Sequence, residues 1–182
     1  METNAERRAK IYPIILKDYN PEWPKWFEEE KTELARILGD NIVRISHVGS
    51  TAVPGLLSKP TVDIQIEISE DADVEKLIAA FPSEYICLYP PDMATLPPHL
   101  TVIKGYLLDG FADRVFHIHF GYSGDDDRLC FRDYLIAHPE IAADYAELKL
   151  RLLKDFEHDR DGYTEAKGEF VRAITERARF FS

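Results

Sequence analysis

The stretch that decides the fold is HVGSTAVPGLLSKPTVDIQIEI, residues 47–68. It starts at the end of an apolar run over 42–48 and passes through a loop punctuated by glycine and proline. It then closes on TVDIQIEI, which alternates strictly between polar and apolar residues. Strict alternation is typical of a half-buried strand. The sequence therefore predicts two strands joined by a glycine-containing loop, with Asp63 on the polar face of the second strand.

The flanking segments predict further helices and strands. A helix is expected at Trp23–Leu38, where Asn20-Pro21 is a start signal, Gly39 is a C-cap and Glu28–Lys31 is interpreted as a solvated face. Further predicted elements are a helix at 71–81, strands at 85–89, 100–108 and 114–120, a Pro-rich loop at 90–99, and helices at 127–138, 141–156 and 163–179. The order predicts an α+β fold, a mixed sheet with the early helices on one face and a C-terminal helical unit. We expect one domain over 1–182, with its core at about 12–124 and its helical unit at about 125–182.

Composition limits the possible partners. The 182 residues include 22 Lys and Arg against 33 Asp and Glu, a formal net charge of −11. This balance argues against duplex nucleic acid and an anionic membrane surface. The acidity is uneven, because residues 1–127 carry 12 basic and 22 acidic side chains whereas residues 128–182 carry 10 and 11. A small anion such as a triphosphate therefore stays possible near the C-terminal helices, which carry Arg132, Lys149 and Lys167. With no leader-type sequence and no apolar run of membrane-spanning length, we expect a cytoplasmic protein.

The opening stretch carries residue types that suit phosphate and metal binding. Gly49 lets the backbone approach a phosphate closely, while Ser50 and Thr51 supply hydroxyl and N–H groups. Asp63 is a natural ligand for a divalent cation. Lys59, just before that strand, is placed to meet a phosphate where the loop returns. The alternatives are a plain tight turn, a surface carboxylate and a solvated lysine.

A pair of histidines is the second chemical feature. His117 and His119 lie two apart in a predicted strand, so both imidazoles point to one face and can converge on one ion. With Asp63 they suit Zn²⁺, Mn²⁺ or Fe²⁺ better than Mg²⁺. One histidine acting as a general base, or a purely structural pair, are the alternatives. His47 is interpreted as a structural imidazole.

These motifs together resemble the glutamate-rich protein B (GrpB) family, whose hallmark is VGSTAVPGL followed by KP and a strand aspartate. FHIHF at 116–120, FRDYLIAHPEIAADYAELK at 131–149 and DGYTEAKGEF at 161–170 match the family in the same order. The resemblance covers residues 12 to about 174. It implies a polymerase-β-type nucleotidyltransferase-like fold, a superfamily marked by Gly-Ser and, about a dozen residues later, Asp-x-Asp or Asp-x-Glu.

One position departs from that superfamily pattern. The superfamily pattern implies a second carboxylate at position 65, where this chain has Gln65. Glu67 points to the same face but lies one strand period further, roughly 6.5 Å along the strand. This departure puts a two-metal transfer site in question. A single-metal site, partly completed by the two histidines, or a site that only binds a nucleotide, stays open.

The C-terminal helices supply further candidates. Family motif positions imply Arg132, Tyr163 and Lys167 as nucleotide contacts, since Arg and Lys suit a polyphosphate and a Tyr ring can stack on a base. Routine packing and pairing between residues four apart on a helix is the alternative. The acidic run at 125–127 is interpreted as a helix start rather than a metal site.

Three functions stay open at this level. The leading one is a nucleotidyltransferase-like enzyme that moves a nucleotidyl or phosphoryl group from a nucleoside triphosphate to a small acceptor, with Mg²⁺, Mn²⁺ or Zn²⁺ as cofactor. Asp63, His117 and His119 would be its catalytic and metal-binding residues. Its nucleotide contacts would be Gly49, Ser50, Thr51, Lys59, Arg132, Tyr163 and Lys167. The others are a non-catalytic nucleotide-binding module and a metal-dependent hydrolase that uses Asp63 and the two histidines.

Overall fold

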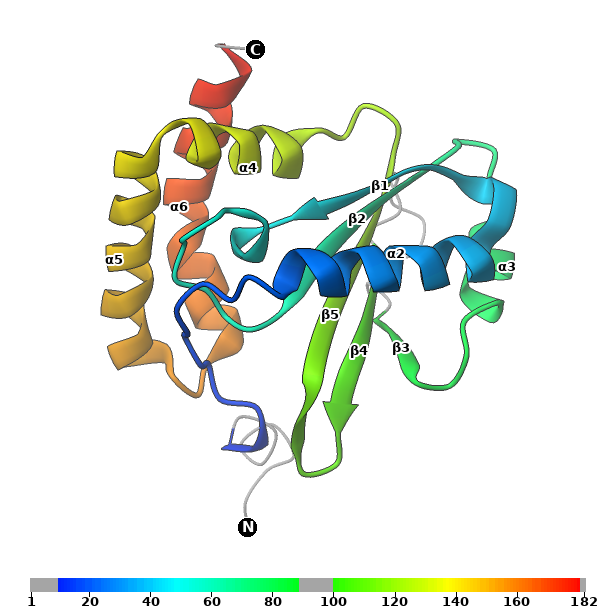
Figure 1. The fold of residues 1–182 in the computed structure, drawn as a ribbon, viewed down its shortest axis with the longest axis horizontal. Coiled ribbons are helices and arrows are strands. Elements are labelled where there is room, and N and C mark those ends of the chain that lie inside the picture. The colour runs from blue at the N-terminus through cyan, green and yellow to red at the C-terminus, as the bar shows by residue number, and fades with distance from the viewer. Residues whose placement is uncertain (1–9, 89–99, 181–182) are drawn as a thin grey trace.

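The computed structural model describes residues 10–88 and 100–180, so the loop expected at 90–99 lies outside the described residues. Within them, a five-stranded sheet has the order β1-β2-β5-β4-β3 (Figure 1). The strands are β1 (Ile42–Val48), β2 (Val62–Ile68), β3 (Tyr85–Leu88), β4 (Thr101–Leu107) and β5 (Gly110–Tyr122). The helices are α2 (Trp23–Leu38), α3 (Val74–Ala79), α4 (Asp127–Ala137), α5 (Pro139–Phe156) and α6 (Arg160–Arg179), with short 3₁₀ turns η1 (Gly39–Asn41) and η2 (Ser50–Ala52). The predicted α+β class with a mixed sheet is confirmed.

The register of the central strands brings the chemical residues together. β2 and β5 run parallel, with Asp63 beside His117 and Gln65 beside His119. β4 runs antiparallel to β5 on the other side and places Thr101 beside His119. Side chains directly opposite on neighbouring strands are close enough to interact. The sheet thus aligns Asp63, both histidines and Thr101 across three adjacent strands.

One face of the sheet is packed against the early helices, as predicted. The apolar side chains of β2 are fully buried against α2, α3 and the matching residues of β4 and β5. The main core consists of Trp23, Phe27, Leu34, Leu38, Val62, Ile64, Ile66, Ile68, Leu77, Tyr85, Leu100, Val102, Phe116, Ile118 and Phe120. Because side chains alternate along a strand, burying these residues turns Asp63 and the histidines to the other face.

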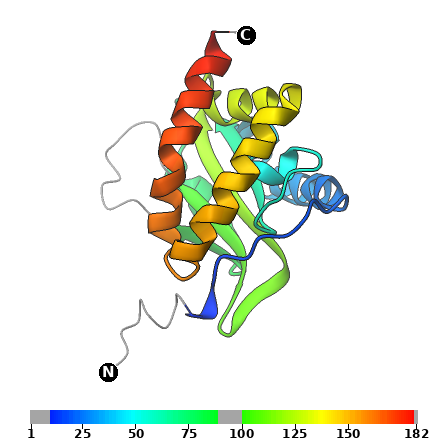
Figure 2. The same ribbon diagram turned by 90° about the vertical axis from the view of Figure 1, so that its left-hand side faces the viewer.

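The C-terminal helices form a second packed unit. Figure 2 shows α5 and α6 side by side in front of the strands, with α4 close to the end of α6. Their apolar stripes meet the η2 loop in a second core made of Val53, Leu56, Phe131, Tyr134, Leu135, Tyr145, Ile174 and Ala178. This core anchors the helices over the loop that joins β1 to β2. The polar face of the sheet is therefore opposed by α5 and α6.

The acidic run of α2 corrects one prediction. Glu30, expected on a solvated face, is only 5% exposed. Its carboxylate accepts hydrogen bonds from Lys104 Nζ (2.8 and 3.0 Å) and from Tyr85 OH (2.6 Å). The prediction of a solvated face is wrong for Glu30, because a charged side chain can face the core when an opposite charge neutralises it there. A helix-face pattern cannot show a partner that lies 74 residues away.

Element ends differ modestly from the predictions. α6 begins at Arg160, three residues before the predicted start, because the Asp159 carboxylate accepts the backbone N–H of Gly162. β5 is longer than predicted and forms a long hairpin with β4. Among residues 10–88 and 100–180, no helix is both long and apolar enough to cross a bilayer.

Candidate functional site

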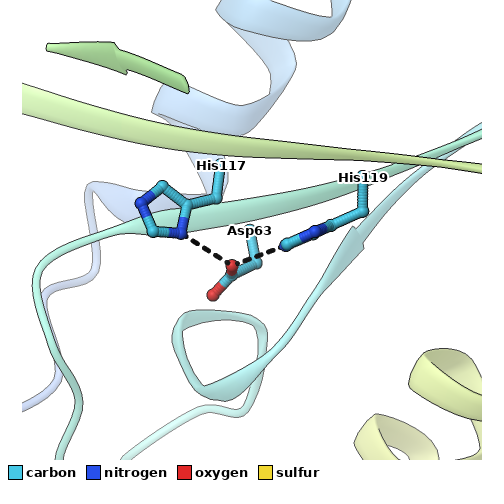
Figure 3. A group of neighbouring side chains, drawn as sticks. All are labelled: Asp63, His117 and His119. Atoms are coloured by element: carbon cyan, nitrogen blue, oxygen red, sulfur yellow. Dashed lines mark hydrogen bonds and ion pairs between the residues drawn. The ribbon is translucent and has the colours of Figure 1, made fainter. Parts of the chain in front are cut away.

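Asp63, His117 and His119 form a compact cluster on the polar face of the sheet (Figure 3). His119 Nε2 lies 3.1 Å from Asp63 Oδ1, and His117 Nδ1 lies 3.8 Å from the same oxygen. The sequence predicted this convergence, and the parallel pairing of β2 with β5 explains it. The cluster lies in a cleft of about 1440 Å³ between the sheet and the C-terminal helices. Gly49, Ser50, Thr51, Lys59, Tyr163 and Lys167 also line this cleft.

The Gly-Ser-Thr loop packs directly on the carboxylate. Gly49 has φ +71°, a conformation that favours glycine, and a Cβ built at this position would lie 2.7 Å from Asp63 Oδ2. The next residues form the short turn η2. Glycine is therefore required here both by the backbone conformation and by the close approach to Asp63.

Thr51 and His47 stabilise the loop from behind. Thr51 is 1% exposed, and its hydroxyl donates to the Thr61 carbonyl (3.2 Å) and accepts from His47 Nε2 (3.0 Å). The His47 ring stacks on Phe27 at 4.9 Å, and burial lowers the pKa of His47 to about 4. The structural interpretation of His47 is confirmed. The Thr51 side chain is committed to the loop, whereas the Ser50 hydroxyl contacts Lys149 of the cleft.

Several cationic side chains enter the same cleft. Lys149 of α5 is 2% exposed, and its Nζ donates to Ser50 Oγ (3.2 Å) and to the Leu57 carbonyl. Lys59 and Lys167 lie over the Tyr163 ring, with Nζ 6.0 and 4.5 Å from its centroid. Arg160 donates to Tyr106 OH (2.9 Å) from the start of α6. Helices α5 and α6 thus bring positive charge to the sheet face that carries Asp63.

These lysines lie close enough to affect one another. Burial, together with the charges of Lys167 and Lys59, lowers the pKa of Lys149 to about 7. Burial likewise lowers the pKa of Lys167 to about 8, with Lys59 adding to the effect. The pKa of Lys59 is also lowered by burial and by Arg160. A buried cation whose pKa falls is one that lacks sufficient compensating negative charge.

The surroundings of Asp63 favour its charged form, in contrast to those of the lysines. Burial acts to raise the pKa of Asp63, but the hydrogen bond from His119 and the nearby positive charges outweigh it and hold the pKa well below its usual value. Burial lowers the pKa of His117 to about 4, against the opposing effect of Asp63. Asp63 is therefore ionised and His117 neutral at neutral pH, the states that a metal ligand needs.

The donor set fits a single divalent cation. One ligand atom from each of Asp63, His117 and His119 lies within 4.8 Å of the others. Two imidazole nitrogens and one carboxylate oxygen suit Zn²⁺ or Mn²⁺, whereas Mg²⁺ prefers oxygen ligands. In the part of the chain that the structure describes, these three residues are the one such group.

Gln65 and Glu67 do not complete a second metal position. Gln65 is 1% exposed, and its amide nitrogen donates to the backbone carbonyl of Asp125. Glu67 is 3% exposed and forms an ion pair with Arg44, which also pairs with Asp126. Gln65 contacts the segment before α4 directly, and Glu67 contacts it through Arg44. Helix α4 begins at Asp127, in agreement with the helix-start interpretation of the 125–127 run. Asp63 therefore supplies the cluster's carboxylate alone.

Arg132 is the predicted contact that the structure does not bring to the cleft. Its guanidinium donates to the backbone carbonyl of His47 (2.7 Å) and to the Asp133 carboxylate. Arg160, Tyr106 and Thr101 also line the cleft and were not predicted, whereas Lys149 was predicted only as a positive charge on the C-terminal helices. Lys149 was visible one helical turn after Tyr145, but only the folded chain places it beside Ser50. A β-bulge at Lys104–Tyr106 hides Tyr106 from a simple alternation pattern.

The chain is similar to known proteins over nearly its whole length. The family model for GrpB protein matches residues 13–177. The chain is similar to UPF0157 protein YqkA of Bacillus subtilis (32% identity, covering 93% of this chain and 49% of YqkA). It is also similar to a dephospho-CoA kinase of Mycolicibacterium paratuberculosis (30% identity, 96% of this chain, 48% of the kinase), so it spans about half the length of both relatives. The crystal structure of conserved protein GrpB from Enterococcus faecalis superposes with a TM-score of 0.76 at 29% identity and covers 92% of this chain and 100% of that one. The chain therefore belongs to the GrpB family, in the nucleotidyltransferase-like superfamily.

Proposed function

We propose that this protein binds a nucleoside triphosphate together with one divalent cation and transfers a nucleotidyl or phosphoryl group to a small acceptor. The observation that carries the proposal is the charge of the cleft. Lys59, Lys149, Lys167 and Arg160 line the cleft that contains Asp63, the one carboxylate of the candidate metal-binding group. A triphosphate supplies the negative charge that these groups lack.

Different residues of the cleft would contact different parts of the phosphate chain. Lys149 and Ser50 form the wall next to the Gly-Ser loop, where the close backbone approach allowed by Gly49 suits a phosphate. Lys167 and Lys59 flank the Tyr163 ring and bring two more ammonium groups to the same anion. Positioning and electrostatic stabilisation supply most of the catalysis in phosphoryl transfer, and these residues provide both.

Asp63, His117 and His119 would hold the cation. A divalent ion bound there would neutralise charge on a phosphate and polarise a phosphoryl oxygen. Asp63 keeps its charge in this setting, since hydrogen bonding to His119 favours the ionised carboxylate. The role of Tyr163 as a base-stacking platform is limited, because its ring is 0% exposed in this structure and already carries Lys167 on one side. Lys167 is therefore the stronger of these two predicted contacts.

The proposal is tested by thermal unfolding with nucleotides in the presence of Mg²⁺, Mn²⁺ or Zn²⁺. A triphosphate at about 100 times its dissociation constant is expected to stabilise the fold by about 2.7 kcal/mol. Asp63→Asn should reduce the metal-dependent part of this shift, and Lys167→Met should reduce the shift with or without metal. Lys76→Met, which changes an exposed lysine on α3, is the matched control and should behave like wild type.

Turnover is then measured as release of pyrophosphate or nucleoside diphosphate in the presence of candidate acceptors. If no nucleotide stabilises the protein under any of the three metals, the proposal fails. If nucleotides bind equally well to wild type, Asp63→Asn and Lys167→Met, the site assignment is wrong.

One observation favours a second candidate, a nucleotide-binding module without turnover. Gln65 faces Asp125 instead of the cleft and Glu67 is paired with Arg44, so the second carboxylate of a two-metal site is missing. This candidate predicts nucleotide-dependent stabilisation that persists in Asp63→Asn, with no product formed. The same titrations separate the two functions.

A further inference from the structure

A hydrogen-bonded chain runs from α6 to the metal cluster. Arg160 Nη2 donates to Tyr106 OH at 2.9 Å, and Tyr106 OH lies 2.7 Å from His117 Nε2. The Arg160 guanidinium also lies over the Tyr106 ring, 5.5 Å from its centroid. The opposite ring nitrogen of His117, Nδ1, faces Asp63 Oδ1 at 3.8 Å. Tyr106 and Arg160 therefore contact the cluster through His117.

The direction of each hydrogen bond in this chain follows from its donors. A guanidinium can only donate, so the Tyr106 oxygen accepts from Arg160. The arrangement that satisfies all three groups then has the Tyr106 hydroxyl donating to His117 Nε2. A neutral imidazole carries one proton, and the bond made at one nitrogen decides which nitrogen holds it. The proton of His117 is thus on Nδ1 and points at Asp63.

His119 is held by a different hydroxyl, that of Thr101. This hydroxyl contacts the Nδ1 nitrogen of His119, whereas Tyr106 contacts the Nε2 nitrogen of His117. Thr101 Oγ1 lies 3.4 Å from His119 Nδ1, and His119 Nε2 lies 3.1 Å from Asp63 Oδ1. The ionised Asp63 carboxylate accepts from Nε2–H, which leaves Nδ1 to accept from Thr101. The two histidines thus turn different nitrogens toward one carboxylate oxygen, and each presents an N–H to it.

This arrangement differs from the usual surroundings of a metal-binding histidine. Such a histidine donates its outer N–H to a carboxylate, carbonyl or water, which leaves the inner nitrogen free to bind the ion. His117 instead accepts at its outer nitrogen, and Arg160 reinforces that direction. The placement of Tyr106 depends on the bulge next to Gly105, whose φ is +89° and whose added Cβ would lie 2.2 Å from the Arg114 carbonyl oxygen.

We infer that Arg160 and Tyr106 are positioning residues that hold His117 as the Nδ1–H tautomer, opposite to the Nε2–H tautomer of His119, and so weaken metal binding by His117. For Nδ1 to bind a cation, the His117 proton must move to Nε2 and the hydrogen bond with Tyr106 must reverse. Arg160 opposes this reversal because its N–H already uses one lone pair of the phenol oxygen, and the reversal would leave the phenol hydrogen without its acceptor on His117. The inference concerns the metal-free site and holds whether or not the protein transfers nucleotides.

The test is nitrogen-15 NMR of the histidine side chains in the metal-free, full-length protein at pH 8. Long-range nitrogen–proton correlations distinguish the two neutral tautomers. We expect His117 protonated at Nδ1 and His119 protonated at Nε2. In Tyr106→Phe, His117 should shift toward the Nε2–H form while His119 is unchanged, and Thr101→Val should leave His117 unchanged. An Nε2–H His117 in wild type, or the same His117 tautomer in wild type and Tyr106→Phe, overturns the inference.

Metal affinity provides a second, independent measurement. Arg160→Met keeps an unbranched apolar stem over Tyr106 and is expected to tighten Mn²⁺ or Zn²⁺ binding about tenfold, the scale on which outer partners of a ligand act. Lys167→Met removes a positive charge from the same cleft without touching Tyr106, so its smaller gain measures the effect of charge alone. In a Tyr106→Phe background, Arg160→Met should give no more than that smaller gain. Equal gains for the two single variants would contradict a specific role for Arg160.

Discussion

Two lysines of this protein enter the interior on opposite faces of the same sheet, and they meet different surroundings. Lys104 of β4 pairs with Glu30 at 2.8 Å and bonds to Tyr85 at 2.9 Å, so its charge is matched within the fold. Lys149 of α5 is 2% exposed and bonds to Ser50 and the Leu57 carbonyl, which are neutral. Its other close charges, Lys167 and Lys59, have the same sign.

The difference is between a lysine whose charge the fold neutralises and a lysine whose charge the fold leaves unmatched. Burying a charge is unfavourable unless an opposite charge or strong hydrogen bonds compensate it. The fold provides such compensation for Lys104 and not for Lys149. The unmatched charge of Lys149 lies in the cleft that also contains Asp63, where an anionic ligand would neutralise it.

The largest expected effect comes from breaking the matched pair. Glu30→Gln leaves Lys104 without its carboxylate, and we expect a loss of about 3 kcal/mol in the free energy of unfolding, the lower end for a buried pair because Lys104 is partly exposed. Urea denaturation measures the change. Glu29→Gln, which affects only an exposed pair with Arg114, should change stability by less than about 1 kcal/mol. Similar losses in both variants would show that the Glu30 pair has no special role.

A change of opposite sign is expected at the unmatched lysine. Lys149→Met removes a buried charge that the fold does not neutralise, so at pH 6 without ligand we expect a gain of about 1–2 kcal/mol in unfolding free energy. Lys104→Met should instead destabilise the protein, because it leaves Glu30 buried without a partner. Urea denaturation of both variants gives the comparison directly. If Lys149→Met destabilises the protein as much as Lys104→Met, the two lysines are both structural.

A further effect is expected in the dependence of the unfolding free energy on pH. The pKa of Lys149 is about 7 in the folded protein and about 10.4 when unfolded. Between these values the unfolded chain binds more protons, so the stability of the wild type should rise with pH through this window. The advantage of Lys149→Met is therefore largest below pH 7 and declines as the pH rises toward 10. Unfolding free energies at pH 6, 8 and 10 test this, and a constant difference between the two proteins would contradict it.

Much of the fold could be predicted from local patterns. The alternation in 61–68 and 114–120 predicted both central strands, and the Gly-Ser-Thr loop with Asp63 predicted residues that line the cleft. These predictions succeed because burial on one face imposes a period of two on each strand. His117 and His119 could be predicted for the same reason, since residues two apart in a strand share a face.

The remaining features depend on contacts between distant segments. Glu30 was predicted as solvated because its partner Lys104 lies on another element. Arg132 was predicted as a nucleotide contact because family motif positions imply it, yet its guanidinium donates to the His47 carbonyl. Tyr106 reaches His117 only through the bulge next to Gly105, which reverses the alternation expected from the sequence. Long side chains have several possible partners, and the tertiary fold selects among them.

The most direct test of the account is calorimetric titration of the metal-free protein with inorganic triphosphate at pH 8, in two buffers of different ionisation enthalpy. The pKa values of Lys149 and Lys167 are about 7 and 8, so both are partly neutral at this pH and a bound anion should make them take up protons. We predict binding with net proton uptake that falls in Lys149→Met and is unchanged in the surface variant Lys76→Met. Absence of binding, or binding with no proton uptake and no response to Lys149→Met, would contradict the claim that the unmatched lysines form an anion site.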